Sequence, residues 1–247
     1  MKPSGEAAAP DIAVPKRPQH RNVLAVLGAL RADLLSSCKF FFGGGTRIFL
    51  ELDEYRESAD ADFLCSDASG YGELRLIATQ QGYDGLFAPE PAKGLHFPRE
   101  MKVDQYGIRF PVALGDDSLR VELIREARIE LGPGVRPDWS PVECLSMEDC
   151  YAEKLLANSD RWSDRQTLSR DLIDLAFLRL RIGPVPETVW RRVRDAYKSA
   201  PEKDLTKALD FFMSDPVHQQ HCLKGLRMEG MSEQLSRGLA LLHQDLT

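Results

Sequence analysis

The sequence predicts an α+β fold, in which a small mixed sheet flanked by helices is followed by a helical C-terminal half. The short segments in which apolar and polar residues alternate, as they do in strands, all lie before residue 130. A segment rich in proline and glycine, 132–141, then interrupts the chain. Every later segment has helical spacing, and several of them start at a proline, which is typical of a helix N-terminus.

Composition divides the chain into four expected parts. Residues 1–21, rich in Pro, Ala, Lys and Arg, are expected to form a disordered tail that lacks the apolar region of a secretory signal. Residues 22–131 are expected to form the α+β core, 132–141 a linker and 142–247 a helical domain. The 247 residues are 43% apolar, which is enough for a core, and no apolar run approaches the ~18 residues that span a membrane. We therefore expect no membrane partner.

Cysteine usage points to a reducing compartment. The chain has five cysteines and no CxxC pair, so we expect reduced thiols and a cytoplasmic protein. His218, His221 and Cys222 are poorly spaced for zinc and no second ligand pair follows, so we interpret them as structural.

Periodicity predicts the elements before the linker in order. Apolar residues recur at helical spacing from Val23 to Leu35, and a short strand then enters a glycine turn. Two segments alternate around Gly107 as a hairpin would. The expected helices are 22–37, 46–55 and 73–81, and the expected strands are 39–42, 59–65, 101–104, 108–112 and 119–124.

After the linker, Ser146 is expected to cap a helix that runs to about Trp162, with acids in its first turn. Later helical segments are expected to begin near Asp164, Pro186, Pro201, Pro216 and Ser232. The net charge of the chain is −6, but residues 150–200 hold ten Lys and Arg against seven Asp and Glu. A polyanionic partner would therefore meet the helical half first.

The glycine turn is the first candidate for chemistry. Phe41 and Phe42 precede Gly43, Gly44 and Gly45, and the chain then enters a helix. Glycines allow positive φ and close approach of the backbone to a ligand, and amides at a helix start favour an anion such as phosphate. Thr46 and Arg47 add a hydroxyl donor and a cation. On its own this segment is better explained as a tight strand–helix turn.

Asp60 and Asp62 strengthen the functional interpretation. Alternate residues of a strand point the same way, so both carboxylates should lie on one face. Two close like charges repel unless a metal or a proton lies between them, and carboxylates suit a hard cation such as Mg²⁺ or Mn²⁺. A phosphate cradle upstream of such a pair predicts metal-assisted phosphoryl or nucleotidyl transfer. The alternative is two solvated aspartates at a strand end.

A second constellation lies in the helical half. Lys154 and Arg161 are two turns apart on one helix face, where Lys154 could meet a triphosphate or simply extend along the edge of the core. Asp171 and Asp174 are three apart among apolar residues, so at least one needs a cationic partner. Spacing alone does not separate a helix–helix salt bridge from a functional carboxylate.

Together, the Gly-Gly-Thr turn with its Asp-x-Asp strand, Lys154-Leu-Leu-Ala, Arg161 and Arg170-Asp-Leu-Ile-Asp-Leu resemble the nucleotidyltransferase superfamily, and specifically the AbiEii/AbiGii type IV toxin family. The resemblance covers roughly residues 40 to 180. The fourteen residues between Gly45 and Asp60 slightly exceed the spacing expected for that family.

The resemblance implies a polymerase-β-like core and metal-dependent transfer of an NMP from an NTP. It implies that Asp60 and Asp62 bind metal, with Glu122 on a neighbouring strand as the best third ligand or else a solvated glutamate. Lys154 and one of Asp171 and Asp174 would be required for activity. The nucleotide-binding residues would be Gly44, Gly45, Thr46, Arg47 and Arg161.

The resemblance further implies a toxin with an antitoxin encoded beside it, and tRNA or another RNA is a possible acceptor. Two rival functions remain open. One is a small-molecule nucleotidyltransferase, against which the helical half without a sugar-binding aromatic cluster argues mildly. The other is a catalytically silent NTP-binding or partner-docking module, against which the Asp60–Asp62 pair argues. The sequence does not select the acceptor, the base or the oligomeric state.

Overall fold

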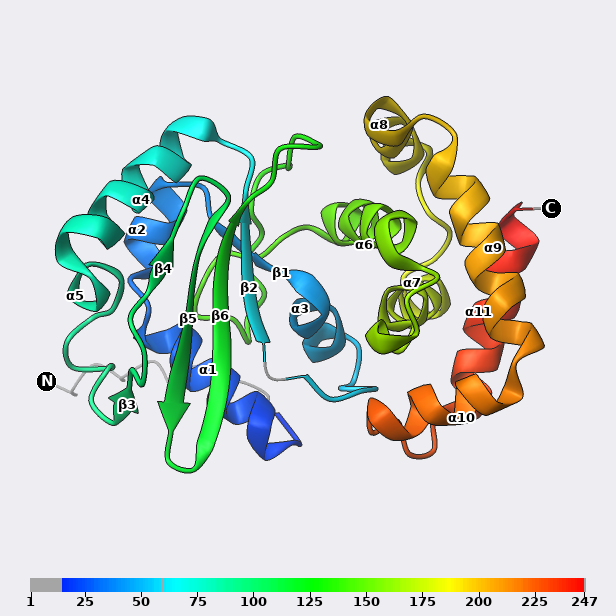
Figure 1. Cartoon of the computed structure of the whole chain (residues 1–247), viewed down its shortest axis with the longest axis horizontal. Helices are drawn as coiled ribbons and strands as arrows, with labels where there is room; N and C mark the ends of the chain where they lie inside the picture. Colours follow the sequence, from blue (N-terminus) through cyan, green and yellow to red (C-terminus); the bar gives the residue numbers. More distant parts are fainter. Residues whose placement is uncertain (1–14, 59, 247) are drawn as a thin grey trace, which may run out of the picture.

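The computed structural model describes residues 15–58 and 60–246. A sheet with helices packed on one side occupies the N-terminal half, and a group of helices occupies the C-terminal half (Figure 1). The strands are β1 (Phe41–Gly43), β2 (Asp60–Cys65), β3 (Leu95–His96), β4 (Lys102–Val103), β5 (Gly107–Leu114) and β6 (Asp117–Arg125).

The helices before the linker are α1 (Pro18–Ala29), α2 (Ala32–Ser37), α3 (Gly44–Glu51), α4 (Ala68–Gln81) and α5 (Tyr83–Leu86). Those after it are α6 (Met147–Arg161), η1 (Arg165–Thr167), α7 (Arg170–Arg181), α8 (Glu187–Tyr197), α9 (Ala200–Ser214), α10 (Pro216–Gly225) and α11 (Ser232–Leu246). The α+β class and the helical C-terminal half are as the sequence predicts. No helix in these ranges is both long and apolar enough to span a bilayer.

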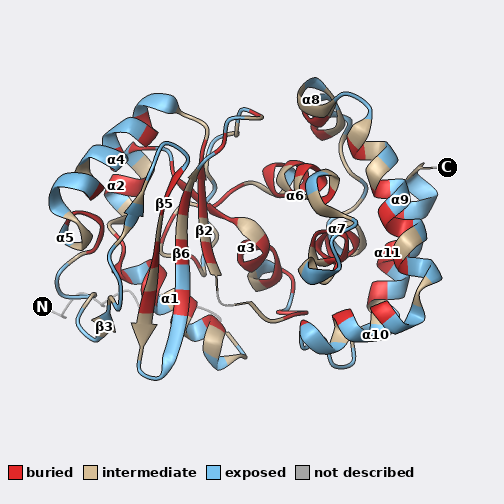
Figure 2. Cartoon of the chain, viewed as in Figure 1, coloured by how far each residue is buried: buried red, intermediate tan, exposed pale blue. Residues whose placement is uncertain are grey.

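The sheet is mixed, with strand order β1-β2-β6-β5-β3, and β4 also pairs with β5. Among the described strands only β2 and β6 run parallel, and the other pairs are antiparallel. One face of the sheet carries side chains such as Phe63, Phe110 and Val121, which pack in a core with α1, α2 and α4. The opposite face of β2 and β6 carries polar side chains and is turned toward the helical half (Figures 1 and 2).

A second core fills the helical half, and α3 belongs to it. Ile48, Phe49 and Leu52 of the α3 region pack with α6, α7 and the helices behind them. The ring of Tyr55 stacks on Phe177 of α7 at 3.9 Å between centroids. The two halves of the chain therefore meet along α3. The predicted division at residues 132–141 is a boundary in the sequence, but α3, which precedes it, packs in the core of the helical half.

Several sequence boundaries need correction. The expected tail 1–21 is too long, because α1 begins at Pro18 and His20 is fully buried; residues 1–14 lie outside the described ranges. The expected helix 22–37 is two helices, because Leu30 takes an extended conformation and pairs with Phe87. The helix after the glycine turn ends at Glu51 rather than at 55, since Asp53 adopts positive φ.

Other expectations are confirmed. The predicted hairpin is the β4–β5 pair, which turns just before Gly107. Ser146 caps α6, accepting a hydrogen bond from the Asp149 amide at 3.1 Å. All five cysteines are free thiols buried in the cores.

Candidate active site

The glycine turn brings backbone and carboxylate into contact. Strand β1 ends at Gly43 and α3 starts at once at Gly44, whose φ is +66°. A Cβ at Gly44 would collide with the carboxylate of Asp62, and one at Gly45 would collide with the guanidinium of Arg56. Only glycine satisfies both the positive φ and this close approach at position 44. The turn therefore lies directly against the acid-bearing strand.

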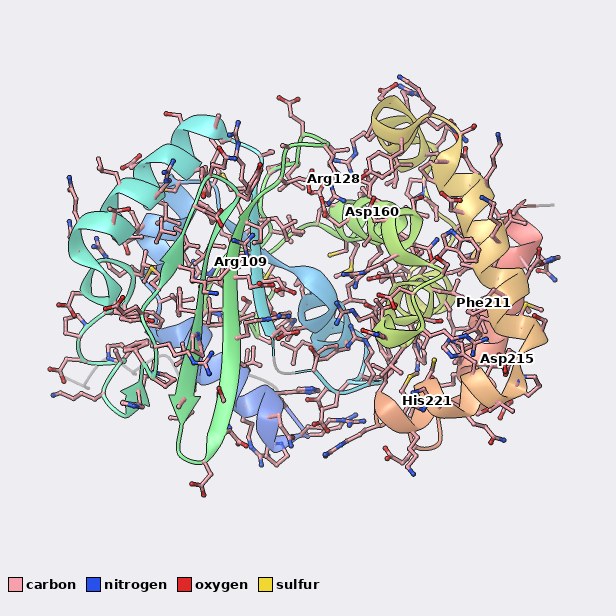
Figure 3. The ribbon with its side chains drawn as sticks, in the orientation of Figure 1. Arg109, Arg128, Asp160, Phe211, Asp215 and His221 are labelled. Atoms are coloured by element: carbon pink, nitrogen blue, oxygen red, sulfur yellow. The ribbon has the colours of Figure 1, made fainter. Side chains whose placement is uncertain are left out.

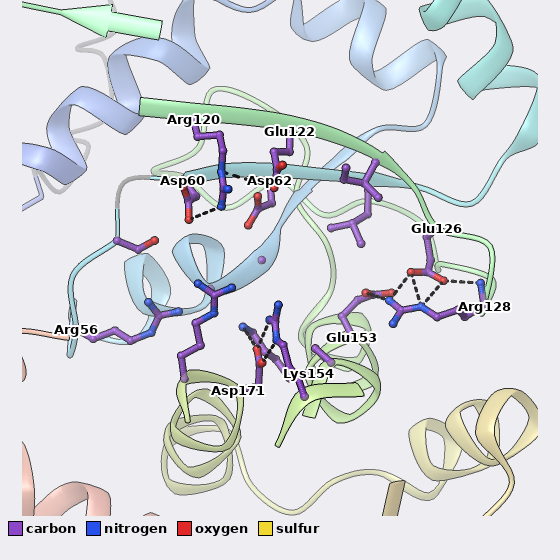
Figure 4. A pocket seen from close by; sticks show the side chains of 18 residues that line it. Arg56, Asp60, Asp62, Arg120, Glu122, Glu126, Arg128, Glu153, Lys154 and Asp171 are labelled. Carbon is purple, nitrogen blue, oxygen red and sulfur yellow. Dashed lines mark hydrogen bonds and ion pairs between the residues drawn. The ribbon is translucent and has the colours of Figure 1, made fainter. Parts of the chain in front are cut away.

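Three carboxylates share the open face of the sheet. Asp62 on β2 is the register partner of Glu122 on β6, and Asp60 is the partner of Arg120. Paired residues on neighbouring strands point to the same side, so Asp60, Asp62 and Glu122 face the helical half together. The sequence-based expectation that the two aspartates share a face holds, and Glu122 joins them there (Figure 4).

The electrostatics of this face favour an added positive charge. Burial, together with the nearby charges of Asp60 and Glu122, raises the pKa of Asp62 to about 6. Arg120 partly offsets these charges, with nitrogens 3.3 Å from Asp60 and 3.8 Å from Glu122. The side chain of Arg120 is about half exposed, so these ion pairs are open to solvent.

Opposite the carboxylates, cations from the helical half line the same cleft, whose volume is about 220 Å³. Arg161 comes from α6 and Arg170 starts α7. Lys154, also from α6, and Arg56, from the segment between α3 and β2, lie on the same side of the cleft (Figure 4). In the described part of the chain Arg170 has no ion pair. The cleft thus sets a carboxylate face against a cationic face, with Gly44 and Gly45 between them.

Lys154 and the two helical aspartates form a buried network. The ammonium of Lys154 lies 2.9 Å from Asp171 and 2.6 Å from Asp174. Arg161 donates two hydrogen bonds to Asp171, at 2.7 and 3.0 Å. Burial raises the pKa of Asp171, but the attraction of Lys154 and Arg161 outweighs it and holds that pKa far below its ordinary range. Asp171 is therefore an anion that orients these cations.

Asp174 is held differently from Asp171. Its side chain is fully buried and does not line the cleft. Arg56 donates two hydrogen bonds to it, at 2.6 and 2.9 Å, and the hydroxyl of Tyr55 donates a third at 2.6 Å. Burial alone would raise its pKa, but Arg56 and Lys154 lower it overall. Asp174 thus anchors Arg56 and Lys154 from behind and does not reach a ligand in the cleft.

Two predicted nucleotide-binding side chains do not reach the cleft. The hydroxyl of Thr46 donates to the backbone carbonyl of Asp60 at 2.6 Å, so it fixes the acid-bearing strand to α3. Arg47 is buried on the other side of α3, where it binds Glu51 at 2.7 Å and lies over the ring of Trp139. The sequence places both next to the glycines, but the helix turns their side chains away.

The sequence reasoning missed Arg56 and a cluster at the other end of the cleft. Glu126, Arg128 and Glu153 line that end, and Arg128 lies 2.6 Å from Glu126 and 2.9 Å from Glu153. Burial raises the pKa of Glu153 to about 8, with Glu126 adding to the rise and Arg128 opposing it. An acid one position before Lys154 was the available signal, but nothing in its spacing separates it from a solvated helix residue.

The donor set fits a hard divalent cation. Within residues 15–58 and 60–246, no three His, Cys, Asp or Glu side chains are drawn together into a group ready to hold a metal. Asp60, Asp62 and Glu122 nevertheless supply oxygen ligands on one face, and the raised pKa of Asp62 marks a place that gains from added positive charge. Carboxylate oxygens are the ligands that Mg²⁺ and Mn²⁺ prefer.

Comparison with known proteins identifies a nucleotidyltransferase family. A family model described as nucleotidyl transferase AbiEii toxin, type IV TA system, matches residues 26–238. A candidate nucleotidyltransferase of H. pylori is 18% identical, with a TM-score of 0.52 over 92% of this chain and 94% of that one. JHP933 from Helicobacter pylori is also 18% identical, with a TM-score of 0.48 over 93% of this chain and 94% of that one. The first likeness shows a shared fold. No curated protein matches the sequence.

Proposed function

This chain belongs to the AbiEii nucleotidyltransferase toxin family, and from that premise we propose that it transfers an NMP from an NTP to RNA in a metal-dependent reaction. Membership makes it a nucleotidyltransferase toxin of a type IV toxin–antitoxin system, with an NTP as substrate and an antitoxin as partner. The metal dependence and the RNA acceptor, tRNA being the first to test, are the proposed parts. The observation that carries the proposal is the carboxylate face of β2 and β6 set against the cations of α6 and α7 in one cleft.

The cationic face is the place for the triphosphate. Arg170, the first residue of α7, lines the cleft together with Lys154 and Arg161. Phosphate is favoured at a helix N-terminus and near clustered cations. Gly44 and Gly45 let the backbone of the turn come close to the phosphates, as no side chain larger than hydrogen fits there. These groups bind and orient the leaving pyrophosphate.

The carboxylate face is the place for the reacting centre. Asp60, Asp62 and Glu122 would hold Mg²⁺ or Mn²⁺, which supplies positive charge to the α-phosphate and lowers the pKa of the acceptor hydroxyl. Arg120, paired with Asp60 and Glu122, must give up at least part of these contacts when the cation binds. The chain itself contributes positioning and electrostatic stabilisation, as is usual in phosphoryl transfer.

The proposal is tested by incubating the purified protein with each α-³²P-labelled NTP, Mg²⁺ and total RNA, and then resolving the RNA. We expect label on RNA only when Mg²⁺ or Mn²⁺ is present, and none with the D62N variant. If label appears in a small molecule or on protein in place of RNA, the acceptor is wrong while nucleotidyl transfer stands. If NTP binds but neither transfer nor pyrophosphate release occurs with any acceptor, the protein is a silent NTP-binding module.

A further inference from the structure

The row of carboxylates continues across the sheet into a row of cations. Asp62 pairs with Glu122, Glu122 pairs with Arg109 on β5, and Arg109 pairs with Lys102 on β4. Residues in register point to the same side, so one line of side chains on the open face changes from acidic to basic toward the sheet edge. Arg109 lies on the strand side of the molecule, well away from Asp160 and Asp215 of the helical half (Figure 3).

These cations line an open groove of about 710 Å³ that adjoins the active-site cleft. Arg99, Lys102, Arg109 and Arg120 line it; Arg109 is already paired with Asp104 at 3.2 Å and with Glu122 at 3.5 Å, and Arg120 is paired with Asp60 and Glu122. Pro98 and Pro111 contribute apolar surface. The groove and the cleft share Asp60, Arg120 and Glu122, so they meet at the reacting centre. Glu100 is the one further acid that lines the groove.

Arg99 and Lys102 are exposed, and their charges are not paired within the described residues. Neither side chain has an ion pair or hydrogen bond with another described residue, since only the backbone carbonyl of Arg99 accepts a bond, from the hydroxyl of Tyr83. Cations left free beside a carboxylate site are suited to an anionic ligand that approaches that site. The pair therefore contributes positive charge that no ion pair within the described residues takes up.

The helical half has fewer cations available to a polyanion than its net charge suggests. Most cations of residues 150–200 are committed to acids: Lys154, Arg161, Arg165, Arg179, Arg181, Arg192 and Arg194 all form ion pairs. A phosphate would have to displace these internal partners. The expectation that a polyanion meets the helical half first, which rested on net charge alone, is therefore not supported by the ion pairs.

The geometry of the reaction also places the leaving pyrophosphate and the acceptor on different sides of the reacting phosphorus. In phosphoryl transfer the attacking and leaving oxygens lie roughly in line on opposite sides of the phosphorus. If the leaving pyrophosphate lies against Lys154 and Arg170, the acceptor must approach from the far side of the carboxylates. That side opens into the groove formed by β4, β5 and β6.

We propose that this groove binds the phosphodiester backbone of the single-stranded 3′ end of the RNA acceptor, with Arg99 and Lys102 as phosphate contacts that lead the terminal hydroxyl to Asp60 and Glu122. The inference rests on the proposed function and adds the acceptor path to it. Spaced cations beside an apolar floor are what a single strand uses, because its phosphates follow the charge and its bases cover the apolar surface.

The test compares the double variant R99Q/K102Q with R191Q/K198Q, a matched control on α8 and just after it that also removes two exposed cations. The probe is a 5′-fluorescein RNA of about 12 nucleotides with a free 3′ hydroxyl, which matches single-strand site sizes. Binding is followed by anisotropy without NTP over a series of salt concentrations. Transfer is measured with the same RNA and labelled NTP, and NTP binding is measured by calorimetry.

We expect R99Q/K102Q to bind RNA about tenfold more weakly at ~0.1 M salt and to lower the salt slope by about 1.4, because each single-strand phosphate contact contributes about 0.7. Its kcat/KM for RNA should fall likewise while the Kd for NTP stays at the wild-type value. The control should match the wild type in all three measurements.

If both variants lose RNA affinity equally, or if only the control loses it, the proposal that RNA binds in this groove is wrong. If the wild type binds NTP but transfers nothing to any RNA, the proposed function fails instead. The anisotropy series is run without NTP, so it decides on the groove in that case too.

Discussion

Asp62 and Glu122 are register partners on the parallel strands β2 and β6, and Gly44, the first residue of α3, packs against the Asp62 carboxylate. One acid is thus fixed from two directions, by the strand pairing and by a turn that leaves no room for a Cβ. The rise in the pKa of Asp62 follows from this enclosure together with its two acidic neighbours. The site holds like charges close together before any ligand binds.

Replacing Asp62 by Asn should abolish nucleotide transfer and leave the fold intact. The pKa of Asp62 in the folded protein, about 6, lies above its ordinary 3.8, so ionisation costs stability. That cost is absent below pH 4 and complete above pH 6. We expect D62N to unfold at the same or a higher temperature than the wild type at pH 7.5, with a smaller difference at pH 4, by differential scanning calorimetry.

Asp60→Asn should also abolish transfer. Near-wild-type transfer by the double variant D60N/D62N would place the reacting centre elsewhere.

Gly44→Ala should weaken NTP binding more than it weakens folding. The new Cβ meets the Asp62 carboxylate and sits at φ +66°, so the turn must shift away from where the phosphates are proposed to bind. Calorimetric titration with a non-hydrolysable NTP measures the effect. Gly72→Ala is the matched control, since a Cβ there meets nothing within 4 Å. Unchanged affinity in G44A would reduce the glycine turn to a structural role.

Much of the site's frame could be predicted from local pattern. The two-residue period of a strand puts Asp60 and Asp62 on one face, and a glycine between strand and helix marks the turn. Both signals act over a few residues, so a single sequence contains them in full. The placement of Glu122 opposite Asp62 needed the strand pairing, which spacing alone does not give.

Long-range partners could not be predicted. Arg56 lies in a polar stretch that looks solvated, and its partner Asp174 is 118 residues away. Burial converts that pair from surface charges into a structural anchor, and only the packing of α3 on α7 creates the burial. Arg47 was misassigned for the matching reason, because proximity in sequence to the glycines says nothing about the helix face from which its side chain leaves.

Lys154→Ala should lose most transfer activity, and Lys154→Arg should recover only part of it. The ammonium fits between Asp171 and Asp174 at 2.9 and 2.6 Å, a gap suited to a compact cation rather than a planar guanidinium. Arg161→Ala should matter less, because Asp171 keeps Lys154 as a partner. Single-turnover transfer rates rank the three variants, and a wild-type rate for K154A would leave Lys154 a purely structural cation.

Asp174→Asn should lower the free energy of unfolding by about 3–5 kcal/mol, the usual cost of removing one partner of a buried ion pair. It would leave Arg56 and Lys154 buried with less compensating charge. Urea denaturation measures the change. Asp204→Asn on α9, which removes an ion pair with the exposed Lys207, is the control and should change stability by less than about 1 kcal/mol. Equal effects would contradict the anchoring role of Asp174.

Glu153→Gln should stabilise the protein increasingly as pH rises. Burial lifts the pKa of Glu153 in the folded state to about 8, above the ordinary 4.5, so folding favours the protonated acid. The resulting penalty is absent below pH 4.5 and complete above pH 8, and the glutamine removes it. One pKa unit corresponds to about 1.4 kcal/mol, so we expect a gain above ~1 kcal/mol at pH 8.5 and little at pH 4.5. The exposed Glu73→Gln on α4 should show no such trend in urea denaturation.

Expression of the wild-type protein in bacteria without its antitoxin should slow growth, and expression of D62N should not. Membership of a type IV toxin family motivates the first expectation, and the need for the carboxylate face motivates the second. R99Q/K102Q should be less toxic than R191Q/K198Q at equal protein levels, because only the former lines the groove. Growth curves with immunoblots of the expressed protein measure both effects. If wild type and D62N slow growth equally, toxicity does not depend on nucleotide transfer at this site, whatever activity the purified enzyme has.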